Sequence, residues 1–384
     1  MRNLNLSAAL QWHICVSQVY RIGAILPNIL QSLITDPTGV PMPVNTRRRL
    51  RTAFLMMLVC VPVALCYEFI ESTLAEDVEG KISVIGLFIG VVLALPLALF
   101  EESGFAERMR RLPFAVAVIV KSLAYIGSLL AVFMTSGLVL GLLRGLQMPD
   151  FWTSLTEPGY YLQTAIGLVL YIIIVFFRQL DRLLGPGMLL RYMVGRYHRP
   201  RLEARIFMFL DLKSSTALGE ELDREAYYGL VNEFFRDISG PVLDHDGEIY
   251  EYVGDEAVIT WKEDLGIKDA NCIGVFFDID RVIEKKRQSY LDRFGVAPEY
   301  KAGVHMGEVV AAEIGDLKKA LVFNGDVLNT GARIQAECGR LEKRLLSSTT
   351  LFNRLTLPAG WTAERMGPTT LRGKSAPVEL VAFA

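Results

Sequence analysis

Cysteine and histidine are scarce in this chain, and their scarcity excludes several kinds of chemistry. The 384 residues include five cysteines and four histidines, and neither set is spaced as metal ligands are. A disulfide framework and a zinc site are therefore not expected. The sequence also has no Gly-x-x-x-x-Gly-Lys-[Ser/Thr] loop and no Ser/His or Cys/His constellation. Nucleophilic hydrolases and P-loop proteins are accordingly poor candidates.

A strong charge of either sign is also lacking. The chain has 40 lysines and arginines against 42 acidic residues, so its net charge of −2 does not favour a nucleic-acid partner. Charged residues make up 21% of the chain and hydrophobic residues 52%, and the apolar excess is concentrated before residue 180. No short apolar segment with an Ala-x-Ala-like site lies near the start, so no cleaved signal peptide is predicted.

Four long apolar runs predict a membrane domain. They cover residues 53–69, 82–100, a stretch within 113–143, and 160–177. Each is close to the roughly 20 residues that a helix needs to cross the hydrocarbon core. We therefore predict a multi-span domain of four helices over residues 51–178, in contact with membrane lipid and preceded by a cytoplasmic N-terminal segment, residues 1–50. Part of that segment, 12–34, is either an interfacial amphipathic helix or a plain cytoplasmic cap.

Basic residues predict the orientation of this domain. Arginines cluster before the first run, between the second and third, and after the fourth, while the other two loops carry acidic residues. By the positive-inside rule both termini face the cytoplasm, and the chain is placed in the cell (inner) membrane. Lys121 lies within the third run, where a lysine that snorkels to the interface is favoured over a functional group.

The sequence pattern changes after residue 178. Gly185-Pro186-Gly187 breaks the helix, and residues 179–202 are predicted to be a linker. Residues 203–384 predict an α+β domain, with helices packed on one mainly antiparallel sheet. The expected strands are 205–212, a pair within 247–261, a second pair within 300–314, and 371–383. The expected helices are 223–235, ending before Gly240-Pro241, 271–290 and 326–338.

Two aspartates stand at predicted strand ends. Asp211 follows the apolar run Phe-Met-Phe-Leu, and Asp255 lies in the turn Val-Gly-Asp-Glu. A pair of carboxylates is suited to Mg²⁺ bound to a polyphosphate. Ser214, Ser215 and Thr216 follow the first aspartate and open a helix whose N–H groups can bind an anion. The alternative is structural, with Asp211 capping that helix and Asp255 forming a hairpin turn.

Asn329 and Arg333 are four residues apart in a predicted helix and therefore lie on the same face. Gly331 and Ala332 leave the helix slim there, so that a ligand or a second chain can approach. An amide beside a guanidinium can hold a sugar oxygen and a developing phosphoryl charge. The alternative is a polar stripe on the surface.

Arg372 and Lys374 place two cations close to the C-terminal strand. They can reach the terminal phosphates of a nucleotide, or they can belong to a solvated turn. The residues alone leave both interpretations open.

Five ordered segments together resemble the catalytic domain of class III nucleotide cyclases. They are Phe209-Leu-Asp-Leu-Lys-Ser-Ser-Thr216, Val253-Gly-Asp-Glu-Ala-Val258, Val304-His-Met-Gly-Glu-Val-Val-Ala311, Gly325-Asp-Val-Leu-Asn-Thr-Gly-Ala-Arg333 and Leu371-Arg-Gly-Lys-Ser-Ala-Pro-Val378. The resemblance covers residues 203–384 and implies a ferredoxin-like α+β fold. It also implies a homodimer in which two chains share each active site.

The resemblance also implies roles for these residues. Asp211, Asp255 and the backbone of Leu212 would hold two Mg²⁺ or Mn²⁺ ions per active site. The ions would activate the ribose 3′-hydroxyl of a nucleoside triphosphate, which attacks the α-phosphorus and releases pyrophosphate. Asn329 of the second chain would orient the ribose, and Arg333 would stabilise the pentacoordinate transition state.

Three positions depart from the adenylate-specific pattern. Glu251 stands where a lysine is expected, four residues before Asp255, and resembles guanylate cyclases because a carboxylate can accept hydrogen bonds from guanine. Val322 occupies the second base-reading position and cannot hydrogen-bond through its side chain. Arg372 replaces the phosphate-binding lysine, with Lys374 in reserve. We favour ATP, because it is the commoner substrate of bacterial-type membrane cyclases. A guanylate cyclase and a catalytically silent nucleotide-sensing membrane module are the alternatives.

Overall fold

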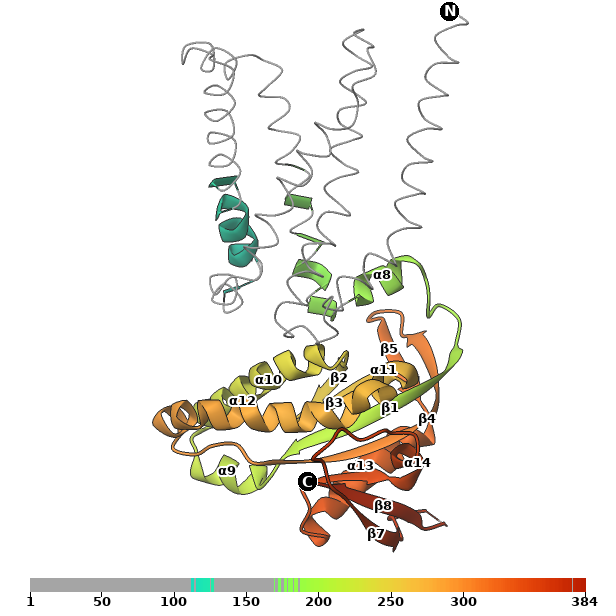
Figure 1. Ribbon diagram of the computed structural model, residues 1–384. Coiled ribbons are helices and arrows are strands. Elements are labelled where there is room, and N and C mark those ends of the chain that lie inside the picture. Colours follow the sequence, from blue (N-terminus) through green and yellow to red (C-terminus); the bar gives the residue numbers. More distant parts are fainter. Residues whose placement is uncertain are drawn as a thin grey trace, which may run out of the picture. The chain divides into compact units, whose positions relative to one another are not determined.

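The computed structural model describes most of the C-terminal half of the chain and short pieces before it. The described residues are 112–113, 115–124, 126–127, 169, 172–173, 176–177, 179–181, 183–185, 187–374 and 376–384. The chain divides into two compact units, Met1–Leu180 and Asp181–Ala384. Figure 1 labels the elements of the second unit, and only this unit is considered below.

The predicted membrane half lies largely outside the described residues. Residues 1–50 and the first two predicted spans, 53–69 and 82–100, lie outside them altogether, and only pieces of the two later spans are described. No helix within the described ranges combines the length and apolarity that crossing a bilayer requires. The four-span domain therefore stays a prediction.

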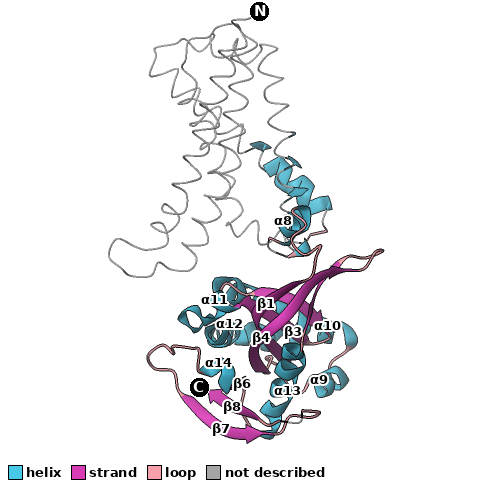
Figure 2. Cartoon of the chain, turned by 90° about the vertical axis from the view of Figure 1, so that its right-hand side faces the viewer, coloured by secondary structure: helices cyan, strands magenta, loops and turns pink. Residues whose placement is uncertain are grey.

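The unit Asp181–Ala384 is built on one sheet of eight strands. They are β1 (Arg201–Leu212), β2 (Glu248–Val253), β3 (Glu256–Lys262), β4 (Tyr300–Ile314), β5 (Ala320–Asn324), β6 (Leu345–Ser348), β7 (Ala363–Thr369) and β8 (Val378–Phe383). Their order is β2-β3-β1-β4-β6-β8-β7, and β5 pairs with β4 beside this path. Among these described strands only β4 and β6 pair in parallel. The prediction of a mainly antiparallel sheet with helices is confirmed (Figure 2).

Helices pack on both faces of this sheet. They are α8 (Met188–Met193), α9 (Ser215–Glu221), α10 (Arg224–Asp244), α11 (Glu263–Ile267), α12 (Asn271–Phe294), α13 (Asp326–Arg340) and α14 (Thr349–Phe352), with a 3-10 turn at Lys268–Ala270. On one face α10 and α12 lie side by side (Figure 1), and Phe234 and Phe276 share a core with Met208 of β1. On the other face α13 is so close that a Cβ on Gly331 would lie 2.6 Å from the ring of Phe209. Strand β1 is thus buried on both sides, as its continuous apolar run predicts.

The predicted end of the helix that starts near residue 223 is wrong. Helix α10 does not end before Gly240 and Pro241 but continues through them to Asp244. Its apolar face extends past the proline at helical spacing, from Ile238 to the buried Val242. Burial of that side chain outweighs one missing backbone hydrogen bond in the last turn.

The strand pair expected within 300–314 is instead the single strand β4, whose partner β5 follows it. The glycines of β4 do not turn the chain; they let α13 approach the sheet. A Cβ on Gly303 would overlap the backbone of Gln335, and a Cβ on Gly307 would lie 2.6 Å from Val327. Elements β5, β6, α14 and β7 were not predicted from the sequence, and only the end of the expected strand 371–383 is a strand, β8.

Candidate active site

Asp211 and Asp255 are neighbours at one end of the sheet. Asp211 is the penultimate residue of β1, and Asp255 lies in the turn between β2 and β3. Strands β1 and β3 pair so that Asp211 is opposite Glu256, the residue after Asp255. Burial raises the pKa of Asp211, and the negative charge of Asp255 raises it further, while Lys301 opposes both effects. The two carboxylates singled out in the sequence therefore interact directly through their charges.

One oxygen of this pair has no hydrogen-bond partner among the described residues. Oδ2 of Asp255 is buried and accepts no hydrogen bond from the described residues. A buried polar atom left unsatisfied costs about 1–3 kcal/mol, and more when it is charged, so this oxygen is suited to a cation. Paired carboxylates are hard oxygen ligands of the kind that Mg²⁺ and Mn²⁺ prefer, and the residues present therefore fit such an ion.

The remaining ligands of such an ion would come from elsewhere. The described residues contain no group of three or more His, Cys, Asp or Glu side chains arranged to hold a metal. Two carboxylates would thus need to be completed by backbone oxygens, water or substrate phosphates, which is how Mg²⁺ usually binds beside a nucleotide.

Two side chains that the sequence analysis did not predict hold Asp211 in place. Gln335 of α13 donates a 2.7 Å hydrogen bond from Nε2 to Oδ2 of Asp211. Nζ of Lys301, which is opposite Asp211 in the pairing of β4 with β1, lies 3.5 Å from the same oxygen. Gln335 is only 6% exposed. An amide on the apolar face of a predicted helix was the available signal, because a buried amide requires a hydrogen-bond partner.

The surroundings of the aspartate pair are anionic. Burial and the charges of Asp211 and Asp255 raise the pKa of Glu256 to about 7. Burial and the same two aspartates also raise the pKa of Tyr227. Shifts of this kind arise where negative charge is poorly compensated, which is typical of a site that binds cations.

The predicted helix start after Asp211 is present. Helix α9 begins at Ser215, and Ser214 precedes it with a left-handed backbone, φ 59°. Ser215 is half-buried, whereas Thr216 is exposed. Because α9 has only seven residues, its dipole acts over a short range, and anion binding by these residues stays a prediction.

Helix α13 offers different residues to different neighbours. Gln335 reaches Asp211, whereas Asn329 is exposed. Arg333 is half-buried, and its Nη2 lies 3.5 Å from the position that a Cβ on Gly373 would take. The contacts among the described residues therefore join Arg333 to the C-terminal turn rather than to the aspartate pair of the same chain.

The C-terminal turn carries the two predicted phosphate-binding cations. Arg372 is exposed. Lys374 pairs with Asp326 at the start of α13, and this hydrogen bond lowers the pKa of Asp326. Lys374 also lines a cavity of about 370 Å³ together with His305 and Thr330. A phosphate that binds Lys374 would have to replace Asp326 as its partner.

The residues next to Glu251 and Val322 contact each other. Glu251 is exposed on β2, and Val322 is half-buried on β5. The rings of Tyr250 and Phe323 have centroids 5.0 Å apart, and the Phe323 N–H donates a 3.5 Å hydrogen bond to the Tyr250 hydroxyl. Two strands that do not pair with each other thus meet at residues adjacent to the two predicted base-reading positions.

Comparison with known proteins identifies the domain. Residues 199–382 match the family model of the adenylate and guanylate cyclase catalytic domain. Adenylate cyclase 2 of Rhizobium meliloti (strain 1021) is 32% identical over 327 residues, which are 83% of this chain and 86% of that protein.

Solved structures of cyclases are also similar. A bacterial light-regulated adenylyl cyclase has 20% identity over 57% of this chain and 63% of its own, with a TM-score of 0.48. The adenylyl cyclase CyaB from P. aeruginosa has 17% identity over 48% of this chain and 96% of its own, with a TM-score of 0.43. On the family match and the 32% identical relative, the chain belongs to the class III adenylate and guanylate cyclases, the enzymes that make cyclic nucleotides.

Proposed function

We propose that this cyclase is an integral membrane enzyme that converts ATP to 3′,5′-cyclic AMP and pyrophosphate, at sites shared by two copies of the chain. The observation that carries the chemistry is the pair Asp211 and Asp255. One buried oxygen of Asp255 has no hydrogen-bond partner among the residues that the structure describes, and burial and charge raise the pKa of Asp211. A triphosphate with its divalent ions would supply the positive charge and the oxygen ligands that this pair lacks.

Asp211, Asp255 and the backbone of Leu212 would hold two Mg²⁺ or Mn²⁺ ions. Bound there, the ions would lower the pKa of the ribose 3′-hydroxyl and neutralise the triphosphate. Gln335 and Lys301 keep the Asp211 carboxylate in one orientation, through contacts of 2.7 and 3.5 Å. Lys301 also offsets part of the negative charge, so that the folded site tolerates two adjacent carboxylates.

The other side chains would act on the sugar and the phosphates. Asn329 would hydrogen-bond the ribose, and Arg333 would donate to the α-phosphate oxygens as negative charge develops there. Ser214, Ser215 and Thr216 would bind phosphate oxygens with backbone N–H groups. Arg372 and Lys374 would bind the terminal phosphates, with Lys374 exchanging Asp326 for phosphate.

A second copy of the chain would complete each site. Within one chain, α13 presents Gln335 to Asp211, while Asn329 is exposed and Arg333 lies against Gly373. This arrangement supports a site in which the α13 of a second chain supplies Asn329 and Arg333 to a substrate held at the aspartate pair. The proposed unit is therefore a homodimer with a shared interface.

ATP is the proposed nucleotide because the relative with 32% identity is named an adenylate cyclase. GTP is the second candidate, and Glu251 favours it, since a carboxylate can accept hydrogen bonds from the N1–H and N2–H₂ groups of guanine. Val322 favours neither base because its side chain has no donor or acceptor.

The four apolar runs support an anchor in the cell (inner) membrane with both termini in the cytoplasm. The match to the R. meliloti protein covers more of the chain than residues 199–384 could supply and therefore includes part of the region before them. The proposed membrane domain thus overlaps a region that the relative also has.

The test is cyclic nucleotide production by membranes that carry the full chain, supplied with Mg²⁺ or Mn²⁺ and with ATP or GTP. We expect cyclic AMP to form, and Asp211→Asn and Asp255→Asn to abolish it. Asp292→Asn, which changes an exposed aspartate on α12, is the matched control. Cyclic GMP as the main product would favour GTP as the substrate. Nucleotide binding without any product would favour the alternative of a catalytically silent sensing module.

A further inference from the structure

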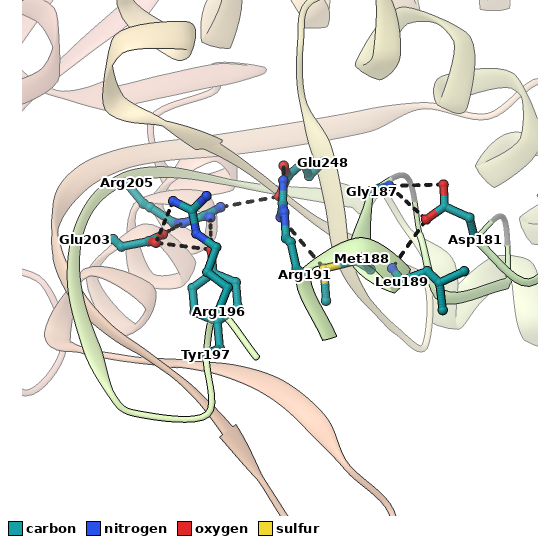
Figure 3. Close-up of polar contacts among 10 residues, drawn as sticks. All are labelled: Asp181, Gly187, Met188, Leu189, Arg191, Arg196, Tyr197, Glu203, Arg205 and Glu248. Atoms are coloured by element: carbon teal, nitrogen blue, oxygen red, sulfur yellow. Dashed lines mark hydrogen bonds and ion pairs between the residues drawn. The ribbon is translucent and has the colours of Figure 1, made fainter. Parts of the chain in front are cut away.

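The segment that leads into the catalytic domain is fastened to it by a series of polar contacts. Asp181 accepts hydrogen bonds from the backbone N–H of Gly187 at 3.1 Å and of Leu189 at 3.3 Å, and so holds the start of α8 (Figure 3). After α8 the buried Tyr197 accepts, through its carbonyl, a 2.9 Å hydrogen bond from the N–H of Glu313 in β4. This segment is therefore an ordered part of the domain surface.

Arg191 of α8 binds strand β2. Its guanidinium makes a two-pronged contact with the carboxylate of Glu248, with Nη1 3.0 Å from Oε2 and Nη2 on Oε1 (Figure 3). Such two-pronged pairs fix orientation as well as distance. Glu248 is the first residue of β2 and lies three positions before Glu251.

Glu248 has a second cation as a partner, and that cation belongs to the core. Arg205 of β1 is fully buried, and its Nη1 lies 3.5 Å from Oε2 of Glu248. Arg205 also donates a 2.9 Å hydrogen bond from Nε to Glu203. Because Arg205 keeps Glu203 and Glu248 in place, removing Arg191 would leave no buried charge uncompensated. Arg191 can therefore be changed without unfolding the domain.

Tyr192, the next residue of α8, binds strand β5. Its hydroxyl accepts a 3.0 Å hydrogen bond from the backbone N–H of Leu321, the residue before Val322. Two consecutive residues of the same helix thus hold the two strands that carry the predicted base-reading positions. These strands also touch each other through Tyr250 and Phe323.

Aromatic rings link β2 to β5, and one of these rings packs against the buried Arg205. The guanidinium carbon of Arg205 lies 4.3 Å from the centroid of the Phe323 ring. The pairing of β2 with β3 is irregular between Ile249 and Glu251. A bulge interrupts the regular ladder and allows a local change in strand direction, so the position of Glu248 can affect that of Glu251.

We propose that Arg191 and Tyr192 are positioning residues for the nucleobase: they hold β2 and β5 at the separation that places Glu251 and Val322 against the base. This inference rests on the proposed function, in which those two positions face the base. It assigns to the linker an effect on nucleotide recognition that is separate from metal binding and from the phosphate-binding turn.

The test compares substrates and inhibitors that do and do not contain a base, using the full chain in membranes. For Arg191→Met and Tyr192→Phe, we expect the KM for the nucleoside triphosphate to rise about three- to tenfold, the size of effect that a partly buried ion pair or hydrogen bond can produce. We expect kcat to change less than twofold, and inhibition by inorganic pyrophosphate, which has no base, to stay the same. The ratio of kcat/KM for ATP to that for GTP should shift. Arg191→Lys should raise KM less than Arg191→Met does.

Two controls separate the possible failures. Arg199→Met changes an exposed arginine of the same segment that makes no ion pair with the described residues, and it should leave KM and the ratio unchanged. Glu251→Lys tests the base-reading position itself. If Glu251→Lys leaves the ratio unchanged, the base-reading part of the proposed function is wrong. If it shifts the ratio while Arg191→Met and Tyr192→Phe do not, or if these two weaken pyrophosphate inhibition equally, the positioning role is overturned and the proposed function stands.

Discussion

Gln335 in the middle of α13 donates a 2.7 Å hydrogen bond to Asp211 at the end of β1, 124 residues earlier in the chain. The contact ties the helix that carries Asn329 and Arg333 to the strand that carries the first predicted metal ligand. The two groups of residues that the proposed mechanism requires are therefore joined directly within one chain, although the proposal assigns them to different sites of a dimer.

Gln335→Leu should weaken divalent-ion binding rather than remove it. Without the amide, Asp211 keeps Lys301 but loses the hydrogen bond that orients its carboxylate. Loss of such an outer partner typically costs 10–100-fold in metal affinity. The Mn²⁺ concentration for half-maximal activity should rise by about that factor, and activity should return at saturating Mn²⁺. Gln288→Leu, which removes an exposed amide bonded to Asp292, is the control. An unchanged Mn²⁺ titration would contradict this role.

Arg333→Met should lower kcat by roughly 10²–10³-fold, the usual effect of losing a preorganised transition-state donor. KM should change little. Because Arg333 lies against Gly373 and not beside Asp211 of its own chain, mixing inactive Arg333→Met and Asp211→Asn chains should restore activity. A mixed dimer keeps one intact site of two, so an equal mixture should recover about a quarter of the wild-type rate. No recovery in a mixture that demonstrably dimerises would argue against shared sites.

His305 should make the catalytic domain less stable in acid. Burial, and then the charge of Lys374, lowers the pKa of His305 to about 4, whereas an unfolded chain has a value near 6.5. Between these values the unfolded state binds the extra proton, so the stability present above pH 6.5 is lost as the pH falls towards 4. His305→Gln should reduce this loss in the free energy of unfolding by up to about 3 kcal/mol. The difference in stability between pH 7.5 and pH 4.5 can be measured by thermal unfolding of the purified chain. His198→Gln, which changes an exposed histidine, is the control.

Gly303→Ala should destabilise the domain where β4 meets α13. An added Cβ would overlap the backbone of Gln335, which cannot move aside as a side chain can. Overpacking of this kind typically costs about 1–3 kcal/mol, and the melting temperature should fall by several degrees. Metal dependence should change as well, since Gln335 holds Asp211. Gly339 is in α13, and a Cβ added there would meet open space. Gly339→Ala is therefore the control and should be neutral or slightly stabilising. Equal melting temperatures would show that α13 can shift without cost.

Local patterns in the sequence predicted the parts of this domain that depend on local physics. The apolar run before Asp211 and the Gly-Asp turn at Asp255 correctly indicated strand ends, and the spacing of Asn329 and Arg333 correctly indicated one helix. Pro241 misled the prediction because burial of Val242 in the tertiary structure outweighs a local helix-breaking signal.

Long-range contacts were the part that the sequence did not predict. Gln335 and Lys301 become partners of Asp211 only when α13 and β4 pack against β1. Arg191 and Glu248 are 57 residues apart, and nothing in the spacing of charges pairs them. The strand pair expected within 300–314 would need a turn, whereas Gly303 and Gly307 are points of close approach to α13, because glycine is suited to both situations.

Strand β4 has a mechanical consequence because of its length. Its 15 residues span roughly 45 Å, with Lys301 at one end and the hairpin to β5 at the other. A continuous strand that pairs with β1 over most of that distance resists bending. Because the strand does not bend easily, Lys301 and the Asp211 carboxylate should stay in place when the linker end shifts. Linker variants should therefore show the same Mn²⁺ dependence as the unchanged chain.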